Sequence, residues 1–557
     1  MTGSACQVDL SLWLKNRLNN WQLALLVFIL IYAVFLLLEL GYMTVQWDEM
    51  PHLYGGLLLS RGQAVAYLTT YGYYPPLYDA MTTGFFFILG ASATSGRLTA
   101  VMFSLLSIWI TFKFTERTYG PKNALIASVL LGVMPGFFWL SRVTMLETML
   151  IFFFTLSLFF FFNWLSRNTN KFRDKTLILA GLALGVGILA KYQVFVSVFV
   201  MFIGILWLAK DKLNLKFTRF LLIVIIAVAV VAPWFAAVYI ANGSDTFQDL
   251  IYVMQEGGQD RAEYSTRFPG PIFYLIEMTW PFPDIPVHPI SLPLYVLGLL
   301  GLGLFAWRRK PEDKLLLTWF IVVYVFFTII PNKQWRYIIP IFPVLAISAA
   351  SLIIFLYGKI TAWTPNPTSL RRQQYKKIAA ALLVVLTSTA IVYSSYEAYQ
   401  MTARDQIHIP IEETANYVAS HISLNESAVI VCAFNLLNQD MLRFYLPANM
   451  SSDQIWQYPE LPVDAFAPNF NITEFVGLCE ERNVRYLILY DFGVDTPFFN
   501  TTLTYSDVTH LIYDTGKFGY TGDEPFFGGD NLNYRTFLVG FRQAYNLPQL
   551  TNSSLGL

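Results

Sequence analysis

The sequence predicts a polytopic α-helical membrane protein with a separate α/β domain outside the cytoplasm. Hydrophobic residues make up 55% of the 557 residues and charged residues only 13%, whereas a soluble domain carries roughly 25% charged residues. The mean hydropathy is +0.48. Apolar runs of about 16–22 residues recur until beyond residue 390, and runs of this length cross ~30 Å of hydrocarbon.

The Lys and Arg residues between these runs predict the orientation, because short basic loops stay in the cytoplasm. Placing all basic clusters inside gives about eleven crossings, with a range of 11–13. They are expected at 21–41, 97–114, 123–140, 148–165, 176–190, 193–209, 218–240, 291–307, 315–330, 337–357 and 378–398. One further apolar segment, 76–90, would reverse every later loop if it crossed. We therefore expect it to lie in or dip into the outer leaflet; the alternative is an additional crossing.

The charge distribution predicts two domains. From residue 401 onward there are 7 Lys/Arg and 18 Asp/Glu. An odd number of crossings places this acidic part outside, so we expect a transmembrane domain over 1–400, with a long first outer loop at 42–96, and an extracytoplasmic α/β domain over 401–557. In the latter, spacing predicts helices at 411–422 and 474–482 and strands at 428–433 and 484–490.

Two adjacent acids, Asp48 and Glu49, stand just after the first long apolar run, Leu23 to Leu38. A charge at membrane depth costs roughly 2.5–3.5 kcal/mol on insertion scales, so acids at this position are candidates for function; the alternative is an ordinary polar loop. Other polar candidates stand in the loops predicted to face outside. They are His52 and Tyr74 in the first loop, Arg142 and Glu147 in the second, Lys191 in the third, Arg261 in the fourth, and Lys333, Arg336 and Tyr337 in the fifth.

These residue types suit a transfer reaction at the membrane face. A carboxylate can accept the proton of an attacking hydroxyl or amine. Arg as a planar fork and Lys as a point charge can hold a leaving phosphate. Lys191, Lys333 and Arg336 stand outside against the usual charge bias, and an anionic lipid headgroup would explain their position. The alternative is that they extend from helix ends to the interface.

The ordered motifs resemble the C-type glycosyltransferases that use polyprenyl-phosphate-linked sugars, in the branch of the protein O-mannosyltransferases and the lipid A aminoarabinose transferase. The matching pieces follow the family's order over residues 47–343, although each is weak alone. They are Trp47-Asp48-Glu49 with His52, Pro75-Pro76-Leu77-Tyr78, Arg97-Leu98, Tyr119-Gly120, Ser141-Arg142 with Glu147, Ala190-Lys191, and Lys333 to Tyr337 with Pro340 and Pro343. The resemblance implies the C-type glycosyltransferase fold, with helices along the membrane in the first outer loop.

The resemblance also implies roles for single residues. Asp48 would be the catalytic base, with Glu49 beside it, and Glu147 the second acid. Lys191, Arg336 and Tyr337 fall on or near positions that contact the lipid phosphate, and Arg261 is a weaker candidate; His52, Tyr74, Arg142 and Lys333 complete the expected substrate-binding set. Two positions depart from the family. Tyr74 stands where relatives often have Lys or His, and Glu147 replaces a commoner Asp.

We therefore expect a membrane glycosyltransferase that moves a hexose-type sugar, mannose-like as first choice, from polyprenyl or dolichyl phosphate by inverting displacement. The acceptor is a protein, lipid or glycan. The alternatives are a flippase or transporter of polyprenyl-linked sugars, which would need polar residues at mid-membrane, and an adhesion or assembly protein acting through the outer domain. We expect membrane lipids but no nucleic acid as partners, and no cofactor; no motif indicates a divalent metal, which stays open. The plasma membrane or endoplasmic reticulum would hold the protein, with its active site outside the cytoplasm.

Overall fold

The computed structural model divides the chain into two compact units. One comprises Met1–Leu40 and Leu58–Arg404, and the other comprises Gly41–Leu57 and Asp405–Leu557. The described residues are 19–43, 45, 47–167, 174–208, 213–248, 251, 267–279, 288–363, 370–404, 410–431, 439–447, 450–458, 471–491, 505–519, 526–528 and 535–541.

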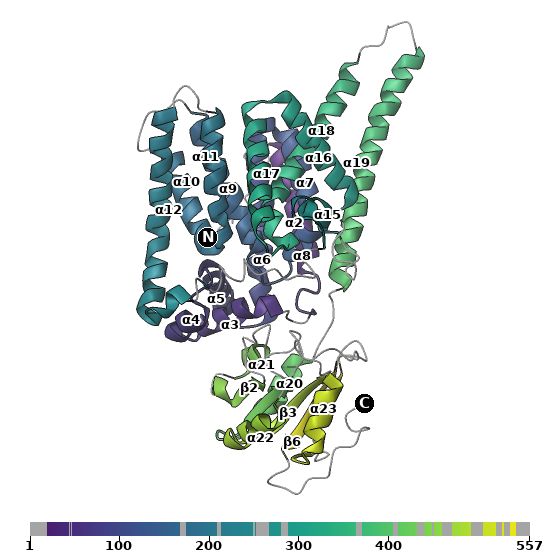
Figure 1. Cartoon of the computed structure of the whole chain (residues 1–557). Helices are drawn as coiled ribbons and strands as arrows, with labels where there is room; N and C mark the ends of the chain where they lie inside the picture. Colours follow the sequence, from purple (N-terminus) through teal and green to yellow (C-terminus); the bar gives the residue numbers. More distant parts are fainter. Residues whose placement is uncertain are drawn as a thin grey trace, which may run out of the picture. The chain divides into compact units, whose positions relative to one another are not determined.

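The apolar runs form the upright helices of the first unit (Figure 1). These are α2 (Asn20–Leu37), α6 (Ala93–Tyr119), α7 (Pro121–Gly132), α8 (Pro135–Leu140), α9 (Glu147–Leu165), α10 (Lys175–Ala190), α11 (Val196–Leu208), α12 (Leu213–Asn242), α16 (Leu292–Arg308), α17 (Pro311–Ile329), α18 (Phe342–Ala362) and α19 (Leu370–Arg404). Each of the eleven predicted crossings coincides with one of them or, at 123–140, with the consecutive pair α7 and α8. Shorter elements join them: α4 (Ala64–Tyr71), α5 (Leu77–Leu89), α15 (Gly270–Glu277), and the 3-10 helices η2 (Tyr192–Phe195) and η4 (Trp335–Ile341).

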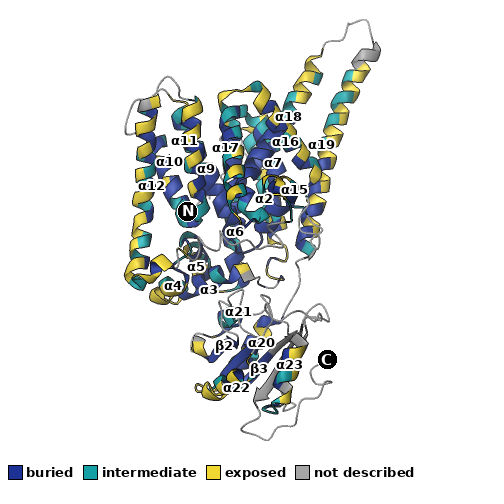
Figure 2. Ribbon diagram, viewed as in Figure 1, coloured by how far each residue is buried: buried dark blue, intermediate teal, exposed yellow. Residues whose placement is uncertain are grey.

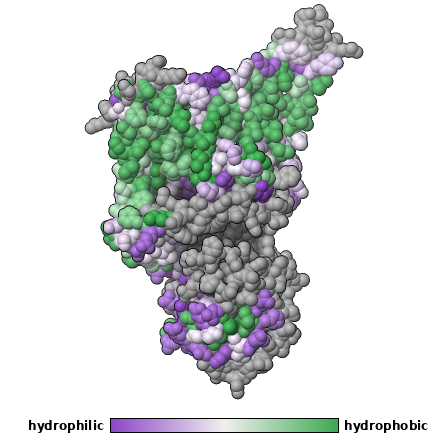
Figure 3. Space-filling model, in the orientation of Figure 1, coloured by the Kyte–Doolittle hydropathy of each residue, from purple (hydrophilic) through white to green (hydrophobic). Residues whose placement is uncertain are grey.

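The helical unit has the surface of an integral membrane protein. Six of its helices are long and apolar enough to cross a membrane, and four shorter apolar helices accompany them within the described residues. Figure 3 shows a broad hydrophobic band over the upright helices. Figure 2 shows exposed residues along α12 and α19, and only 22% and 11% of their apolar windows are buried. Contiguous exposed apolar surface of this size is lipid-facing surface rather than water-facing surface.

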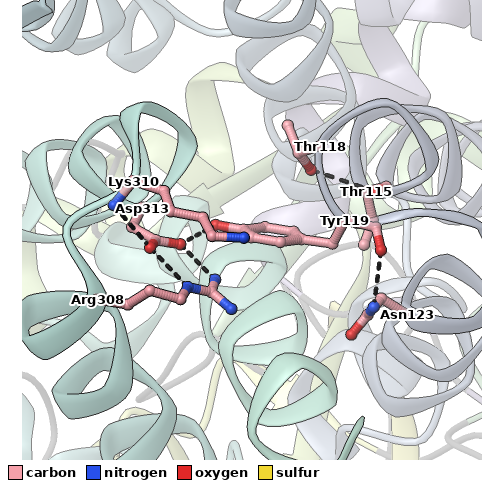
Figure 4. Close-up of polar contacts among 7 residues, drawn as sticks. All are labelled: Thr115, Thr118, Tyr119, Asn123, Arg308, Lys310 and Asp313. Carbon is pink, nitrogen blue, oxygen red and sulfur yellow. Dashed lines mark hydrogen bonds and ion pairs between the residues drawn. The ribbon is translucent and has the colours of Figure 1, made fainter. Parts of the chain in front are cut away.

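The Tyr119-Gly120 motif ends α6 and ties it to two other helices. Tyr119 Oη donates to Asp313 Oδ1 at 2.7 Å, and Arg308 Nε donates to Asp313 Oδ2 at 2.8 Å (Figure 4). Asp313 is fully buried. The Arg308 guanidinium and the Tyr119 hydroxyl compensate its carboxylate for the loss of hydration. Gly120 has φ +87°, a conformation that favours glycine, and Pro121 then begins α7. This network fixes the junction of α6, α16 and α17.

The predicted outer-leaflet segment 76–90 forms the helix α5, which lies with α4 towards the lower end of the helical unit in Figure 1. Its 13 residues would span about 20 Å, which is less than the ~30 Å of hydrocarbon. Tyr67 Oη on α4 donates to Asp79 Oδ2 on α5 at 2.7 Å, and both residues are buried. A buried hydrogen bond to a carboxylate thus joins the two short helices.

The second unit is built around a six-stranded mixed sheet of order β2-β1-β3-β6-β4, with β5 also paired to β6. β1 is parallel to β2 and β3, while β6 is antiparallel to β3. The strands are β1 (Ser427–Val431), β2 (Ile455–Tyr458), β3 (Val484–Asp491), β4 (Phe518–Gly519), β5 (Phe526–Gly528) and β6 (Arg535–Phe541). The helices are η1 (Trp47–Glu49), α3 (Met50–Ser60, which continues into the first unit), α20 (Ile411–His421), α21 (Gln439–Tyr445), η5 (Ser452–Gln454), α22 (Ile472–Glu481) and α23 (Tyr505–Asp514). The two helices and two strands predicted for this domain are among them.

Candidate active site

The Trp47-Asp48-Glu49 triplet forms a 3-10 turn, η1, directly before α3. Asp48 is exposed, whereas Glu49 is fully buried and His52 is 4% exposed. An exposed carboxylate can reach a solvent-borne acceptor, and a buried one cannot without rearrangement. Of the two predicted catalytic acids in this unit, only Asp48 therefore has the accessibility that a general base needs.

In the helical unit, Glu147 and Lys191 form an ion pair. Lys191 Nζ donates to Glu147 Oε1 at 2.8 Å, and the two side chains are 15% and 5% exposed, respectively. Glu147 is the first residue of α9, and Lys191 directly follows α10 in extended conformation. An acid at a helix N-terminus and a cation at a helix C-terminus are each favoured by the helix dipole. Each charge is thus stabilised by its own helix as well as by the other.

A glycine allows the two helices to approach closely enough for this pair. Gly187 lies one turn before Lys191, and a Cβ atom there would come within 2.8 Å of Phe153 Cβ and of Val194 Cγ1. Since real Cβ atoms do not approach so closely, a larger residue would push α10 away from α9. The position of the Lys191 ammonium therefore depends on this close helix contact.

Arg336 brings a second cation to Glu147. It lies on η4, where its Nη2 donates to Gln334 Oε1 at 2.9 Å and its Nη1 lies 3.4 Å from Met145 Sδ. Arg336 acts electrostatically on Glu147 in the direction that favours the ionised carboxylate, as Lys191 does. Two cations therefore favour the ionised form of Glu147: Lys191, which directly follows α10, and Arg336 on η4.

The cluster of Glu147, Lys191 and Arg336 carries a net charge of +1 when all three side chains are ionised. It therefore attracts an anion. A phosphate is recognised by the combination of a planar guanidinium fork and a mobile ammonium. The helix N-terminus at Glu147 adds backbone donors of the kind that bind phosphate.

Two predicted substrate-binding cations contact backbone carbonyls at helix ends. Arg142 donates from Nη1 to Phe35 O and Leu36 O and from Nη2 to Leu38 O, at 2.7–3.0 Å, at the end of α2. Lys333, 8% exposed, donates to Ile330 O at 2.9 Å beyond the end of α17. These contacts satisfy carbonyls that lack partners within their own helices.

The remaining candidates are Tyr74, Tyr337 and Arg261. Tyr74 is partly buried, and its ring centroid lies 4.4 Å from that of Tyr73. Tyr337 follows Arg336 on η4, and its ring packs 6.4 Å from Phe327. Arg261 lies outside the described residues. No group of three or more His, Cys, Asp and Glu side chains suited to a metal ion occurs among the residues that the structure describes.

Two buried charges were not among the predicted site residues. Arg97, fully buried, donates from Nη1 to Leu40 O at 2.8 Å. Asp79, also fully buried, accepts the Tyr67 hydroxyl, and burial followed by the effect of Asp79 raises the pKa of Tyr67. Both lie in predicted membrane-associated segments. In such segments a single charged residue among apolar ones is the sequence signal that could have identified them as candidates.

Comparisons of sequence agree with the motif series. A family model described as dolichyl-phosphate-mannose-protein mannosyltransferase matches residues 74–236. An undecaprenyl phosphate-alpha-4-amino-4-deoxy-L-arabinose arabinosyl transferase 2 from Proteus mirabilis is 27% identical over 325 residues, which cover 54% of this chain and 53% of the relative. The transferase of that name, without the number, from Wigglesworthia glossinidia brevipalpis is 24% identical over 353 residues, or 61% and 60%. The chain thus spans about half to three fifths of the length of these curated relatives.

Comparisons of structure extend over more of the chain. ArnT from Cupriavidus metallidurans, bound to undecaprenyl phosphate, matches with a TM-score of 0.62 and 15% identity, covering 94% of this chain and 99% of that one. The archaeal oligosaccharyltransferase AglB from Archaeoglobus fulgidus, in complex with an inhibitory peptide and a dolichol-phosphate, matches with a TM-score of 0.55 and 14% identity, covering 86% and 70%. At these identities the likeness shows the fold. The resemblance drawn from the ordered motifs is confirmed for the fold and for the branch.

Proposed function

We propose that this chain, an integral membrane protein with the C-type glycosyltransferase fold, is a glycosyltransferase whose donor is a sugar linked to a polyprenyl phosphate. The observation that carries the proposal is the ion pair of Lys191 with Glu147, together with Arg336, which contacts Met145 two residues before Glu147 and acts electrostatically on its carboxylate. A lipid phosphate is an anion that such a cluster would hold at the membrane face. The donors named for the curated relatives, and the lipid phosphates in ArnT and AglB, belong to the same chemical class.

The proposed reaction is an inverting displacement at the anomeric carbon. A hydroxyl or amine of the acceptor attacks this carbon, and the bond from the carbon to the phosphate oxygen breaks, with its electron pair leaving on the phosphate. Asp48 takes the proton of the attacking group, which is the task of a general base. Its exposure, and the burial of its neighbour Glu49, support this choice between the two acids.

The cations would act on the leaving group. As the bond to the sugar breaks, the phosphate gains negative charge, and pre-positioned cations stabilise that charge more than the charge of the ground state. Lys191 and Arg336 are partly or largely buried, so their positions are fixed before the donor arrives. Tyr337 and, by resemblance alone, Arg261 would complete the contacts to the lipid phosphate.

The sugar and the acceptor are finer parts of the proposal. The matched family description favours mannose, which is also the hexose that the resemblance implies. The curated relatives favour 4-amino-4-deoxy-L-arabinose as the second candidate. The acceptor is a protein, lipid or glycan on the extracytoplasmic side, where the predicted orientation places residues 42–96 and 401–557.

The test is a direct transfer assay with purified full-length protein in lipid nanodiscs. Radiolabelled mannose and 4-amino-4-deoxy-L-arabinose are offered on polyprenyl phosphate, and mannose also on a nucleotide, with the host's membrane proteins and glycolipids as acceptors. Label that reaches an acceptor from a lipid donor, with release of polyprenyl phosphate, supports the proposal. Transfer from the nucleotide sugar alone would refute the donor class. In sealed proteoliposomes, movement of the intact lipid-linked sugar between leaflets without bond cleavage would favour a flippase.

A further inference from the structure

Two buried arginines contact one short stretch of backbone. Arg97 comes from the first turns of α6, and Arg142 from the segment between α8 and α9. Together they donate to four carbonyl oxygens within residues 35–40, those of Phe35, Leu36, Leu38 and Leu40, at 2.7–3.0 Å. The two guanidinium groups therefore bind four of the six carbonyl oxygens of residues 35–40 at the exit of α2.

This exit needs such partners. The last four carbonyls of a helix receive no hydrogen bond from an N–H group of the same helix. In addition, the helix dipole favours a cation near the C-terminus. Just beyond α2, Glu39 has φ +51°, a conformation that residues other than glycine rarely adopt. Such a conformation costs on the order of 1–3 kcal/mol and persists only where its surroundings impose it.

The arrangement is also electrostatically expensive. Arg97 is fully buried and Arg142 is 6% exposed. Burial lowers the pKa of Arg142 and the nearby charge of Arg97 lowers it further, while Glu39 opposes both effects. A single cation or ordered water would be enough to cap a helix. The use of two buried arginines at one helix end indicates that the path of the backbone beyond α2 must be fixed accurately.

We propose that Arg97 and Arg142 are positioning residues that fix the course of the chain from the end of α2 towards Asp48. Asp48 follows Leu40 by eight residues, so the direction in which the chain leaves α2 bears on where its carboxylate lies. This inference rests on the proposed function of Asp48 as the base. It gives Arg142 a role through the backbone in place of the direct substrate contact expected from the sequence.

Lysine substitutions test the fork geometry. A lysine keeps the positive charge but is a point donor on a flexible stem, so it cannot reproduce a guanidinium that bridges three carbonyls. Arg142→Lys should therefore disturb the exit more than Arg97→Lys, because Arg142 donates to three of the four carbonyls and Arg97 to the fourth. Arg117→Lys is the matched control, because Arg117 is exposed near the other end of α6 and donates to the Asn163 side chain.

Turnover is measured per folded molecule in nanodiscs, with the lipid-linked donor that is active in the transfer assay. A misplacement of about 1 Å in a catalytic group can cost about 10²-fold in rate. We expect Arg142→Lys to lower kcat by about this factor with the donor KM within about twofold, Arg97→Lys to lower kcat less, and Arg117→Lys to leave both unchanged. In an Asp48→Asn background, Arg142→Lys should cause little further loss, because groups that act as a unit are not additive.

The outcomes separate the two proposals. If Asp48→Asn is inactive while both lysine variants keep wild-type kcat, the positioning role is overturned and the function stands. An equal fractional loss from Arg142→Lys in the wild-type and Asp48→Asn backgrounds would also overturn it, since that is the mark of a general structural defect. If Asp48→Asn turns over at the wild-type rate, the base assignment fails first. Should Arg142→Lys not fold, Arg97→Lys carries the same comparison.

Discussion

The carboxylate of Glu147 lies 2.8 Å from the ammonium of Lys191, across 44 residues of sequence. This pair joins the start of α9 to the end of α10. A carboxylate held by a cation is a poorer proton acceptor than a solvated one, so the pair separates the roles of the predicted acids. Under the proposed function, Glu147 would orient a cation that binds the phosphate, and Asp48 would accept the proton.

The first prediction concerns the coupling within this pair. Residues in direct ionic contact typically show interaction energies of about 0.5–3 kcal/mol in a double-mutant cycle. Glu147→Ala and Lys191→Ala should each lower the thermal unfolding temperature in detergent, since each leaves a largely buried charge without its main partner. The double variant should lose less stability than the two single losses combined. Strictly additive losses would show that the contact contributes nothing.

The second prediction compares the two acids of the triplet. Asp48→Asn keeps size and hydrogen bonding but removes the proton acceptor, and general-base catalysis contributes about 10²–10⁴-fold. We expect a loss of kcat in that range, with normal membrane insertion and unchanged donor KM. Glu49→Gln, at a fully buried position, should affect stability more than kcat per folded molecule. The reverse ranking would transfer the base to Glu49.

The third prediction concerns donor binding. Lys191→Ala and Arg336→Ala should each weaken use of the lipid-linked donor by about 1.5–3 kcal/mol, the value of a hydrogen bond to a charged group, or roughly 10- to 150-fold in kcat/KM. Lys359→Ala is the control, because Lys359 is exposed towards the far end of α18 and packs over Phe355. Unchanged donor kinetics in both test variants would place the phosphate elsewhere and leave these cations as helix-end charges.

Much of the fold follows from hydrophobic length alone, because a segment that crosses a membrane must satisfy its backbone internally as a helix. The eleven apolar runs therefore coincide with helices. In the second unit, alternating and helical spacing also identified β1, β3, α20 and α22. The short strands β4 and β5 have two and three residues, which is too few for a periodic signal.

The site was harder to predict because sequence shows a charge without its partner. Arg142, Lys191 and Lys333 look alike as isolated cations in predicted outer loops. The structure gives Lys191 a carboxylate, while the other two contact carbonyls at the ends of α2 and α17. Whether a cation meets a carboxylate or a carbonyl depends on which helices pack together, and the sequence around each cation does not show that packing.

The last prediction concerns orientation, on which the proposed location of the chemistry depends. Moving the α5 segment through the membrane would place four residues of one basic loop, Arg167 to Lys175, on the outside together with later clusters, against the bias that sets orientation. Single cysteines at exposed positions in protein otherwise free of cysteine report the sides. Thr94 precedes most of α6, Lys122 follows it, and Leu424 in the second unit is 81% exposed. Burial raises the pKa of the native Cys479 thiol to about 12, so it stays protonated at the labelling pH and its replacement removes little background.

In sealed cells or vesicles, cysteines at 94 and 424 should react with an impermeant thiol reagent from the same side, and one at 122 should react only after the membrane is opened. If 94 and 122 react from the same side, α6 does not cross as predicted. If 94 and 424 react from opposite sides, the number of crossings between them is not the even number that eleven crossings require, and the extracytoplasmic placement of the second unit fails.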